Sequence, residues 1–173
     1  MGTMQHFALM ARYNAWANAR LHGCVADLPE ADYRRDVGLF FGSVHATLNH
    51  ILLVDRLWSR RIRGVDPGIH TLDQILCDDF ASLRAAQRAE DENLIALVNG
   101  LDEARLATTV RHRRLVGGHE AEARIGHMLT TLFNHQTHHR GQVHAALTQA
   151  GLSPPGLDVI FFIDETGAGA AKS

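Results

Sequence analysis

Four long stretches of the sequence place their apolar residues three or four positions apart, the spacing that puts side chains on one face of an α-helix. We expect these helices at about residues 3–26, 43–63, 72–98 and 120–150. Neither an internal repeat nor a change of composition divides the sequence between them. Because amphipathic helices bury their apolar faces against one another, the sequence predicts an all-α fold, a four-helix bundle that forms a single domain over residues 1–173.

Local signals mark the ends of the second and third helices. Ser43 can cap the start of the second helix with its hydroxyl, and Gly64 can end it in the left-handed conformation. Thr71 is followed three residues later by Gln74, a pattern that resembles a capping box and predicts the start of the third helix. Residues 101–118 are expected to form a long connection that can contain a short hairpin.

The composition limits the classes of function. Of the 173 residues, 46% are hydrophobic and 21% are charged, as in an ordinary globular protein. The formal charge of -2 gives no broad basic field, so we expect no nucleic-acid partner. The exception is a local cluster of Arg111, Arg113 and Arg114, which we interpret as a solvated loop, with a binding patch for an anionic substrate as the alternative.

Two further features bear on the cellular compartment. The sequence does not begin with a charged segment followed by an apolar one, and no apolar run approaches ~18 residues. The two cysteines, Cys24 and Cys77, lie in separate apolar segments and are expected to be reduced thiols. We therefore expect a cytoplasmic protein without a membrane partner.

Histidine is the compositional outlier, with 12 residues, three of which occur in the stretch N-H-Q-T-H-H-R-G-Q at residues 134–142. His135 and His139 lie four positions apart, so both imidazoles share one helix face and can reach one metal ion. His50, beside the apolar stripe of the second helix, is the natural third ligand. Three imidazoles leave at least one coordination position free, as in a catalytic rather than a structural site.

Simpler explanations compete with this metal site. A single helix histidine such as His50 is more often a core or surface residue than a ligand, and clusters arise by chance in a chain with 12 histidines. For His138 the alternatives are a hydrogen bond, a place in the cavity or a place on its rim. Gln142 either bonds within the cavity or caps a polar patch, and Arg140 is expected to face away.

Asp55 falls inside the main apolar stripe of the second helix, where a carboxylate needs a partner. In one interpretation it is a structural buried acid tied to Asn14, Asn18 or Trp58. In the other it lies behind the metal site and accepts a hydrogen bond from one of the ligand imidazoles.

The fourth helix carries a second apolar line, formed by Leu129, Phe133 and Leu147, which is more than one bundle interior needs. A contact with a buried tail or a homodimer face would explain it. The apolar run at residues 157–163 is expected to pack back on the bundle, and the small-residue tail at residues 166–173 is expected to fray.

Three helix segments and the closing segment carry a family resemblance. They are Y-N-A-W-A-N at residues 13–18, G-S-V-H-A-T-L-N-H-I-L-L-V-D-R-L-W at 42–58, N-H-Q-T-H-H-R-G-Q-V at 134–143 and P-P-G-L-D-V-I-F-F at 154–162. In order and spacing they resemble the DinB family, within the DinB/YfiT-like superfamily of metalloenzymes. The resemblance covers nearly the whole chain.

The resemblance implies an up-down-down-up four-helix bundle that is usually dimeric. It also implies a divalent metal ion held by one histidine of the second helix and an H-x-x-x-H pair. Those positions match His50, His135 and His139 in this sequence. Zinc and nickel come first among the metals, with iron, copper and manganese left open.

The resemblance also suggests a chemistry. Related branches of the superfamily include mycothiol-dependent maleylpyruvate isomerase and bacillithiol S-transferases, in which the metal activates a low-molecular-weight thiol. The leading hypothesis is therefore a divalent-metal-dependent enzyme with a small-molecule substrate, either a thiol-dependent transferase or isomerase or a hydrolase. The alternatives are a metal-binding or stress-response protein without turnover and a dimeric interaction module.

Overall fold

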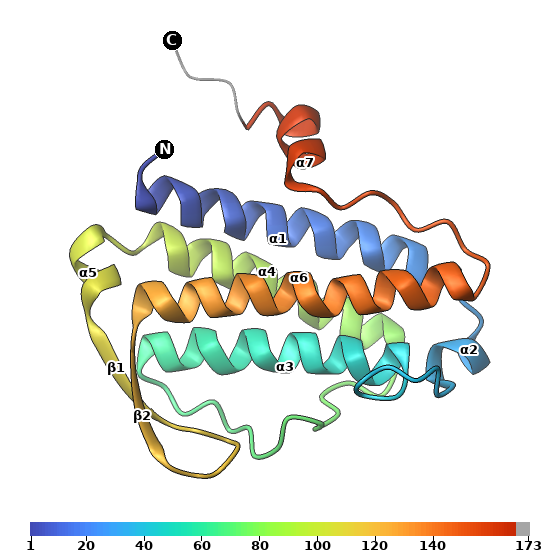
Figure 1. The fold of residues 1–173 in the computed structure, drawn as a ribbon, viewed down its shortest axis with the longest axis horizontal. Coiled ribbons are helices and arrows are strands. Elements are labelled where there is room, and N and C mark those ends of the chain that lie inside the picture. The colour runs from blue at the N-terminus through green and yellow to red at the C-terminus, as the bar shows by residue number, and fades with distance from the viewer. Residues whose placement is uncertain (169–173) are drawn as a thin grey trace.

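The computed structural model describes residues 1–168 (Figure 1). Within these residues the predicted all-α fold is confirmed as a mostly helical one, because a two-stranded sheet is also present. Residues 169–173, part of the tail that is expected to fray, lie outside the described residues. The elements are α1 (Thr3–Val25), α2 (Glu30–Arg34), α3 (Val44–Arg63), α4 (Phe80–Asn99), α5 (Glu103–Ala107), β1 (Thr109–Arg113), β2 (Glu120–Arg124), α6 (Ile125–Gln149) and α7 (Val159–Thr166).

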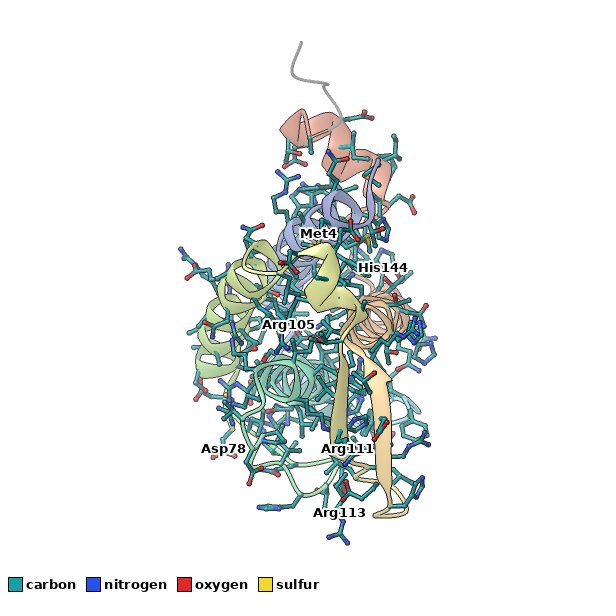
Figure 2. The ribbon with its side chains drawn as sticks, turned by 90° about the vertical axis from the view of Figure 1, so that its left-hand side faces the viewer. Met4, Asp78, Arg105, Arg111, Arg113 and His144 are labelled. Atoms are coloured by element: carbon teal, nitrogen blue, oxygen red, sulfur yellow. The ribbon has the colours of Figure 1, made fainter. Side chains whose placement is uncertain are left out.

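The four long helices, α1, α3, α4 and α6, lie side by side with their axes roughly aligned (Figure 1). α1 and α6 run in one direction, and α3 and α4 run in the opposite one. Each packs against two of the others, so they surround a common interior that Figure 2 shows nearly end-on. All four helices contribute buried leucines to it, among them Leu21, Leu48, Leu83 and Leu132. In the described part of the chain, every helix falls short of the length and apolar character that a membrane crossing requires.

The predicted ends of the second helix are confirmed in α3. The hydroxyl of Ser43 accepts a hydrogen bond from the backbone N–H of Ala46 at 3.1 Å. Gly64 follows the last turn with a φ of 72°, the left-handed conformation that glycine adopts without steric cost. His50 and Asp55 therefore lie on a helix that is capped at both ends.

The predicted start of the third helix is wrong. Residues 72–79 form a connection, and α4 begins only at Phe80. Its N-cap is Asp79, whose carboxylate accepts a hydrogen bond from a backbone N–H of the first turn at 2.8 Å. The predicted capping box of Thr71 and Gln74 therefore starts no helix.

Asn49 of α3 explains why this connection is not helical. Its side chain is fully buried, and its Oδ1 accepts from the backbone N–H groups of Leu76 and Cys77, each at 2.9 Å. Its Nδ2 donates to the backbone carbonyl of Cys77 at 3.1 Å. A side chain that satisfies backbone groups in this way competes with helix formation. The connection is thereby held against α3, close to His50.

The prediction of the fourth helix is wrong over residues 120–124, which form β2 and pair with the antiparallel strand β1. The sequence E-A-E-A-R favours a helix, but contacts across the sheet override that preference. Val110 lies opposite Ala123, and both pack against the apolar core, while Arg111 forms an ion pair with Glu122. β1 lies in the connection in which a hairpin is expected, and α6 starts immediately after β2.

The second apolar line of α6 is used inside the chain. Leu129, Phe133 and Leu147 are all buried, and the ring of Phe133 stacks on that of Phe7 in α1, with centroids 6.5 Å apart. These contacts explain the line without a second copy of the chain. The homodimer therefore stays a prediction.

The C-terminal segment packs against the outer side of α1 (Figure 1). Phe162 of α7 is buried against Tyr13 and Ala17. The hydroxyl of Tyr13 donates to the backbone carbonyl of Leu157 at 2.6 Å. The expected packing of residues 157–163 is thus made on α1, away from the histidines.

Candidate metal centre

His50, His135 and His139 come together between α3 and α6, which pack against each other. One ring nitrogen from each lies within 4.8 Å of the other two. The ring centroids are 4.3 to 4.8 Å apart. Within the described part of the chain, no other group of three histidines, cysteines or acids has its ligand atoms so close together.

His50 is fixed from two sides. Its Nδ1 lies 2.7 Å from the backbone carbonyl of Leu72, and because a carbonyl only accepts, the proton is on Nδ1. Its Nε2 keeps its lone pair and lies 2.9 Å from Nε2 of His135. The ring of Phe41 stacks on the imidazole of His50, with centroids 3.9 Å apart. No sequence pattern predicts either neighbour, since Phe41 lies in a loop and Leu72 in a segment that is predicted to be helical.

Gln142 orients His139 and contacts His138. Its Oε1 lies 2.8 Å from Nδ1 of His139, so this imidazole carries its proton on Nδ1 and its Nε2 lone pair is free. The amide Nε2 of Gln142 lies 3.3 Å from Nε2 of His138. His138 is exposed on the rim, with its ring edge-on to that of His139 and the centroids 4.8 Å apart.

All three imidazoles are held in the neutral form. Burial lowers the pKa of His50 to about 4 and the pKa of His135 to about 3. Burial also lowers the pKa of His139. The neutral imidazole is the form that binds a metal ion, so no proton has to leave at neutral pH.

The donor set fits a divalent transition metal. Two nitrogens bound to one tetrahedral metal at about 2.0 to 2.1 Å lie ~3.3 Å apart. In this structure Nε2 of His50 lies 2.9 Å from Nε2 of His135, slightly closer than that value. No pair of ligand nitrogens in the cluster is more than 4.8 Å apart. Nδ1 of His135 is buried without a hydrogen-bond partner among the described residues. A proton there leaves its Nε2 free to bind metal.

Asp55 does not hydrogen-bond to any of the three imidazoles. It is fully buried, and its Oδ2 accepts from the amide of Gln87 at 2.9 Å and from the amide of Gln136. Burial raises the pKa of Asp55 to about 8. Its interpretation as an acceptor for a ligand imidazole is therefore wrong, and the structural interpretation holds with partners other than Asn14, Asn18 and Trp58.

The expectation that Arg140 faces away is also wrong. Arg140 is 2% exposed, and its guanidinium donates to the side-chain oxygens of Asn14, Asn18 and Gln136. The two asparagines in turn donate to the carboxylate of Asp91 in α4, at 3.2 and 2.9 Å. We refer to the connected set as the buried polar network: Asn14, Asn18, Asp55, Gln87, Asp91, Gln136 and Arg140.

The buried polar network joins all four long helices directly beside the histidines. Gln136 and Arg140 each follow one histidine of the pair, so His135 and His139 lie on the neighbouring face of α6. Burial raises the pKa of Asp91 to about 7, so protonated carboxyl groups limit the negative charge around Arg140. The network thereby fixes the rotation of the helix that presents two of the three imidazoles.

Comparisons with known proteins match nearly the whole chain, including the residues of the histidine cluster. The model of the DinB family matches residues 1–171. The chain is also similar to Protein DinB of Bacillus subtilis (strain 168), with 25% identity over 174 residues, which span 94% of this chain and 98% of that protein. Both matches therefore include the helices that carry the three histidines.

Proposed function

Because the chain belongs to the DinB family, we propose that it is a divalent-metal-dependent enzyme whose metal ion is held by His50, His135 and His139. The observation that carries this proposal is the approach of three neutral imidazoles within 4.8 Å. Three neutral rings, two buried and one half-buried, that only pack against one another would leave acceptor lone pairs without donors, which is unfavourable away from water. A metal ion satisfies all of them.

The chain's own residues prepare this site. The Leu72 carbonyl and Gln142 fix the tautomers of His50 and His139, and such contacts typically raise metal affinity 10- to 100-fold. Phe41 covers the His50 ring and excludes water from it. His138 places an exposed imidazole at the rim, beside the ring of His139. A bound divalent metal contributes a Lewis acid with a free coordination position.

For the reaction, we propose a small-molecule substrate together with a low-molecular-weight thiol, in a transferase or isomerase. The resemblance to thiol-dependent branches of the superfamily supports this choice, and so do three imidazole ligands, which leave room for a thiolate. Zinc or nickel is the proposed metal.

We also propose that the four long helices form the up-down-down-up bundle of the family, as one domain, and that the protein is a homodimer. The directions of α1, α3, α4 and α6 support the bundle. Light scattering tests the dimer: the expected mass is twice the 19.1 kDa of the chain, and a mass near 19.1 kDa contradicts it.

Metal analysis of protein purified without a metal-affinity tag tests the site. We expect about one metal ion per chain for the natural protein and loss of the metal in His135→Ala, because an open three-histidine site binds tightly enough to copurify. His127→Ala, an exposed histidine of the same helix, is the matched control and should keep its metal. Less than about 0.2 metal per chain, unchanged by His135→Ala, would contradict the proposal.

A panel of thiols with electrophilic substrates tests the reaction separately. Glutathione, bacillithiol and mycothiol are each offered to the metal-loaded protein, to His135→Ala and to His127→Ala. We expect metal-dependent conjugation or isomerisation with at least one thiol, lost in His135→Ala alone. If the protein holds its metal but turns over no thiol, the transferase and isomerase assignments are wrong and the metal site stands.

A further inference from the structure

A hollow lies at the end of α3, between the segment that follows this helix and the β1–β2 hairpin. Its volume is about 610 Å³, within the range of about 300 to 1,000 Å³ that is usual for small-molecule sites. Figure 2 shows Arg111 and Arg113 on this hairpin. The hollow is thus built partly from the arginine cluster that stands out in the sequence.

The lining of the hollow is strongly positive. Four arginines border it: Arg61, Arg111, Arg113 and Arg114. Among the described residues that line it, Asp66 is the one carboxylate, and its Oδ1 already accepts from the backbone N–H of Gly68 at 2.9 Å. Arg111 is balanced by Glu122, whereas the other three arginines make no ion pair with a described residue.

Arg61 is a buried positive charge without a carboxylate partner among the described residues. It is only 8% exposed, and its guanidinium lies 5.1 Å from the centroid of the Trp58 ring. Within the described residues its side chain donates one hydrogen bond, to the backbone carbonyl of Arg113. A guanidinium has five N–H donors, and buried charges are normally paired. Arg61 therefore has unused donors at the wall of a positively charged hollow.

We propose that this hollow is a binding site for a small molecule that carries a phosphate or carboxylate group, with Arg61 as its central ligand. The planar fork of a guanidinium matches both oxyanions in a bidentate geometry. Arg113 and Arg114 add attraction from the hairpin side. His112 of β1 lines the same hollow, and burial together with the positive charges of Arg61 and Arg114 lowers the pKa of its imidazole.

The anion site is separate from the histidine cluster. Arg61 follows His50 by eleven positions on α3, which at 1.5 Å per residue corresponds to ~16 Å along the helix. The two sites share one segment: His70 lines the hollow, and Leu72, two residues later, holds Nδ1 of His50. An anion in the hollow therefore binds next to the segment that orients a proposed metal ligand.

Calorimetric titration with inorganic phosphate and with citrate tests this proposal, at an ionic strength held constant with sodium chloride. We expect saturable binding of at least one of the two anions. Arg61→Met should weaken it at least 10-fold. Arg114→Met, at an exposed position of the same hollow, should weaken it by a smaller factor, and it guards against a folding defect in the buried variant. Tighter binding of phosphate would indicate that the natural ligand carries a phosphate group. Tighter binding of citrate would indicate that it carries a carboxylate.

The matched control is Arg88→Met, because Arg88 is an exposed arginine of α4 outside the hollow. It should bind both anions with the affinity of the natural protein. If neither anion binds, or if Arg61→Met and Arg114→Met bind as tightly as Arg88→Met, the hollow is not an anion site. This result would leave the metal site untouched, because metal content is measured independently.

Discussion

The histidine cluster and the buried polar network lie on neighbouring faces of α6, and they differ in how their polar atoms are paired. In the cluster, the ring nitrogens of three neutral imidazoles face one another. In the network, Nη1 of Arg140 donates to acceptors on Asn14, Asn18 and Gln136. Among its fully buried side-chain atoms, Oδ1 of Asp55 and Oε1 of Gln87 are the two without a hydrogen-bond partner in the described residues.

This difference indicates that the histidine cluster is a binding site and that the buried polar network stabilises the helices around it. A set of acceptors without donors is unfavourable in a protein core unless a cation joins it. A network in which most buried donors meet acceptors does not need a cation to join it, and it holds its helices in one arrangement. α6 carries both because consecutive helix residues point about 100° apart, so each histidine is followed by a residue that faces the interior.

The largest effect is expected from breaking the network. Arg140→Met leaves three side-chain oxygens without their donor and removes the cation beside Asp91, so the free energy of unfolding should fall by about 3 to 5 kcal/mol. Urea unfolding at neutral pH measures the change. Arg88→Met, which removes an 84% exposed arginine paired with Glu92, should change it by less than ~1 kcal/mol. Equal losses in the two variants would show that the network does not support the fold.

An intermediate effect is expected at the boundary of the histidine cluster. Gln142→Leu removes the acceptor for Nδ1 of His139, so metal affinity should fall about 10- to 100-fold while unfolding of the metal-free protein is little changed. Competition with a chelator measures the affinity. Gln149→Leu, at an exposed position of the same helix, is the control. An unchanged affinity in Gln142→Leu would mean that the hydrogen bond does not tune the ligand.

The smallest effect concerns Asp55 and its pH dependence. Burial raises its pKa in the folded protein to about 8, against about 3.9 in an unfolded chain, so the folded state binds more protons between these values. The free energy of unfolding therefore falls as the pH rises through that window. Asp55→Asn should make the fall from pH 6.5 to 8 less steep. Its new amide can also donate to the unpartnered Oε1 of Gln87, a gain of about 1 kcal/mol at pH 8.

Unfolding of the metal-free protein at several pH values measures this change. The three imidazoles have lowered pKa values in the folded state, and they change this slope equally in the natural protein and in Asp55→Asn. The difference between the two slopes therefore reports Asp55. Asp164→Asn, at an exposed position of α7, should keep the slope of the natural protein. A slope in Asp55→Asn equal to that of the natural protein would show that Asp55 is already ionised in the fold.

Helix periodicity located the long helices well, but local preference failed at two boundaries. Residues 72–79 carry a capping pattern, yet Asn49 binds their backbone and keeps them against α3. Residues 120–124 are good helix formers, yet pairing with β1 makes them a strand. In both places the deciding partner is distant in sequence, so no pattern within the segment could reveal it.

The helical character and the three histidines could be predicted from residue order alone, because spacing along a helix fixes which side chains share a face. Residue order could not determine where Asp55 and Arg140 point, because that depends on which helix lies opposite. The packed fold was needed to show that Leu72 and Gln142 set the tautomers of His50 and His139, and that Arg61 lines a hollow without a carboxylate partner among the described residues. Hydrogen bonds and charges act between atoms that chain folding brings together, and their partners exist only in the packed molecule.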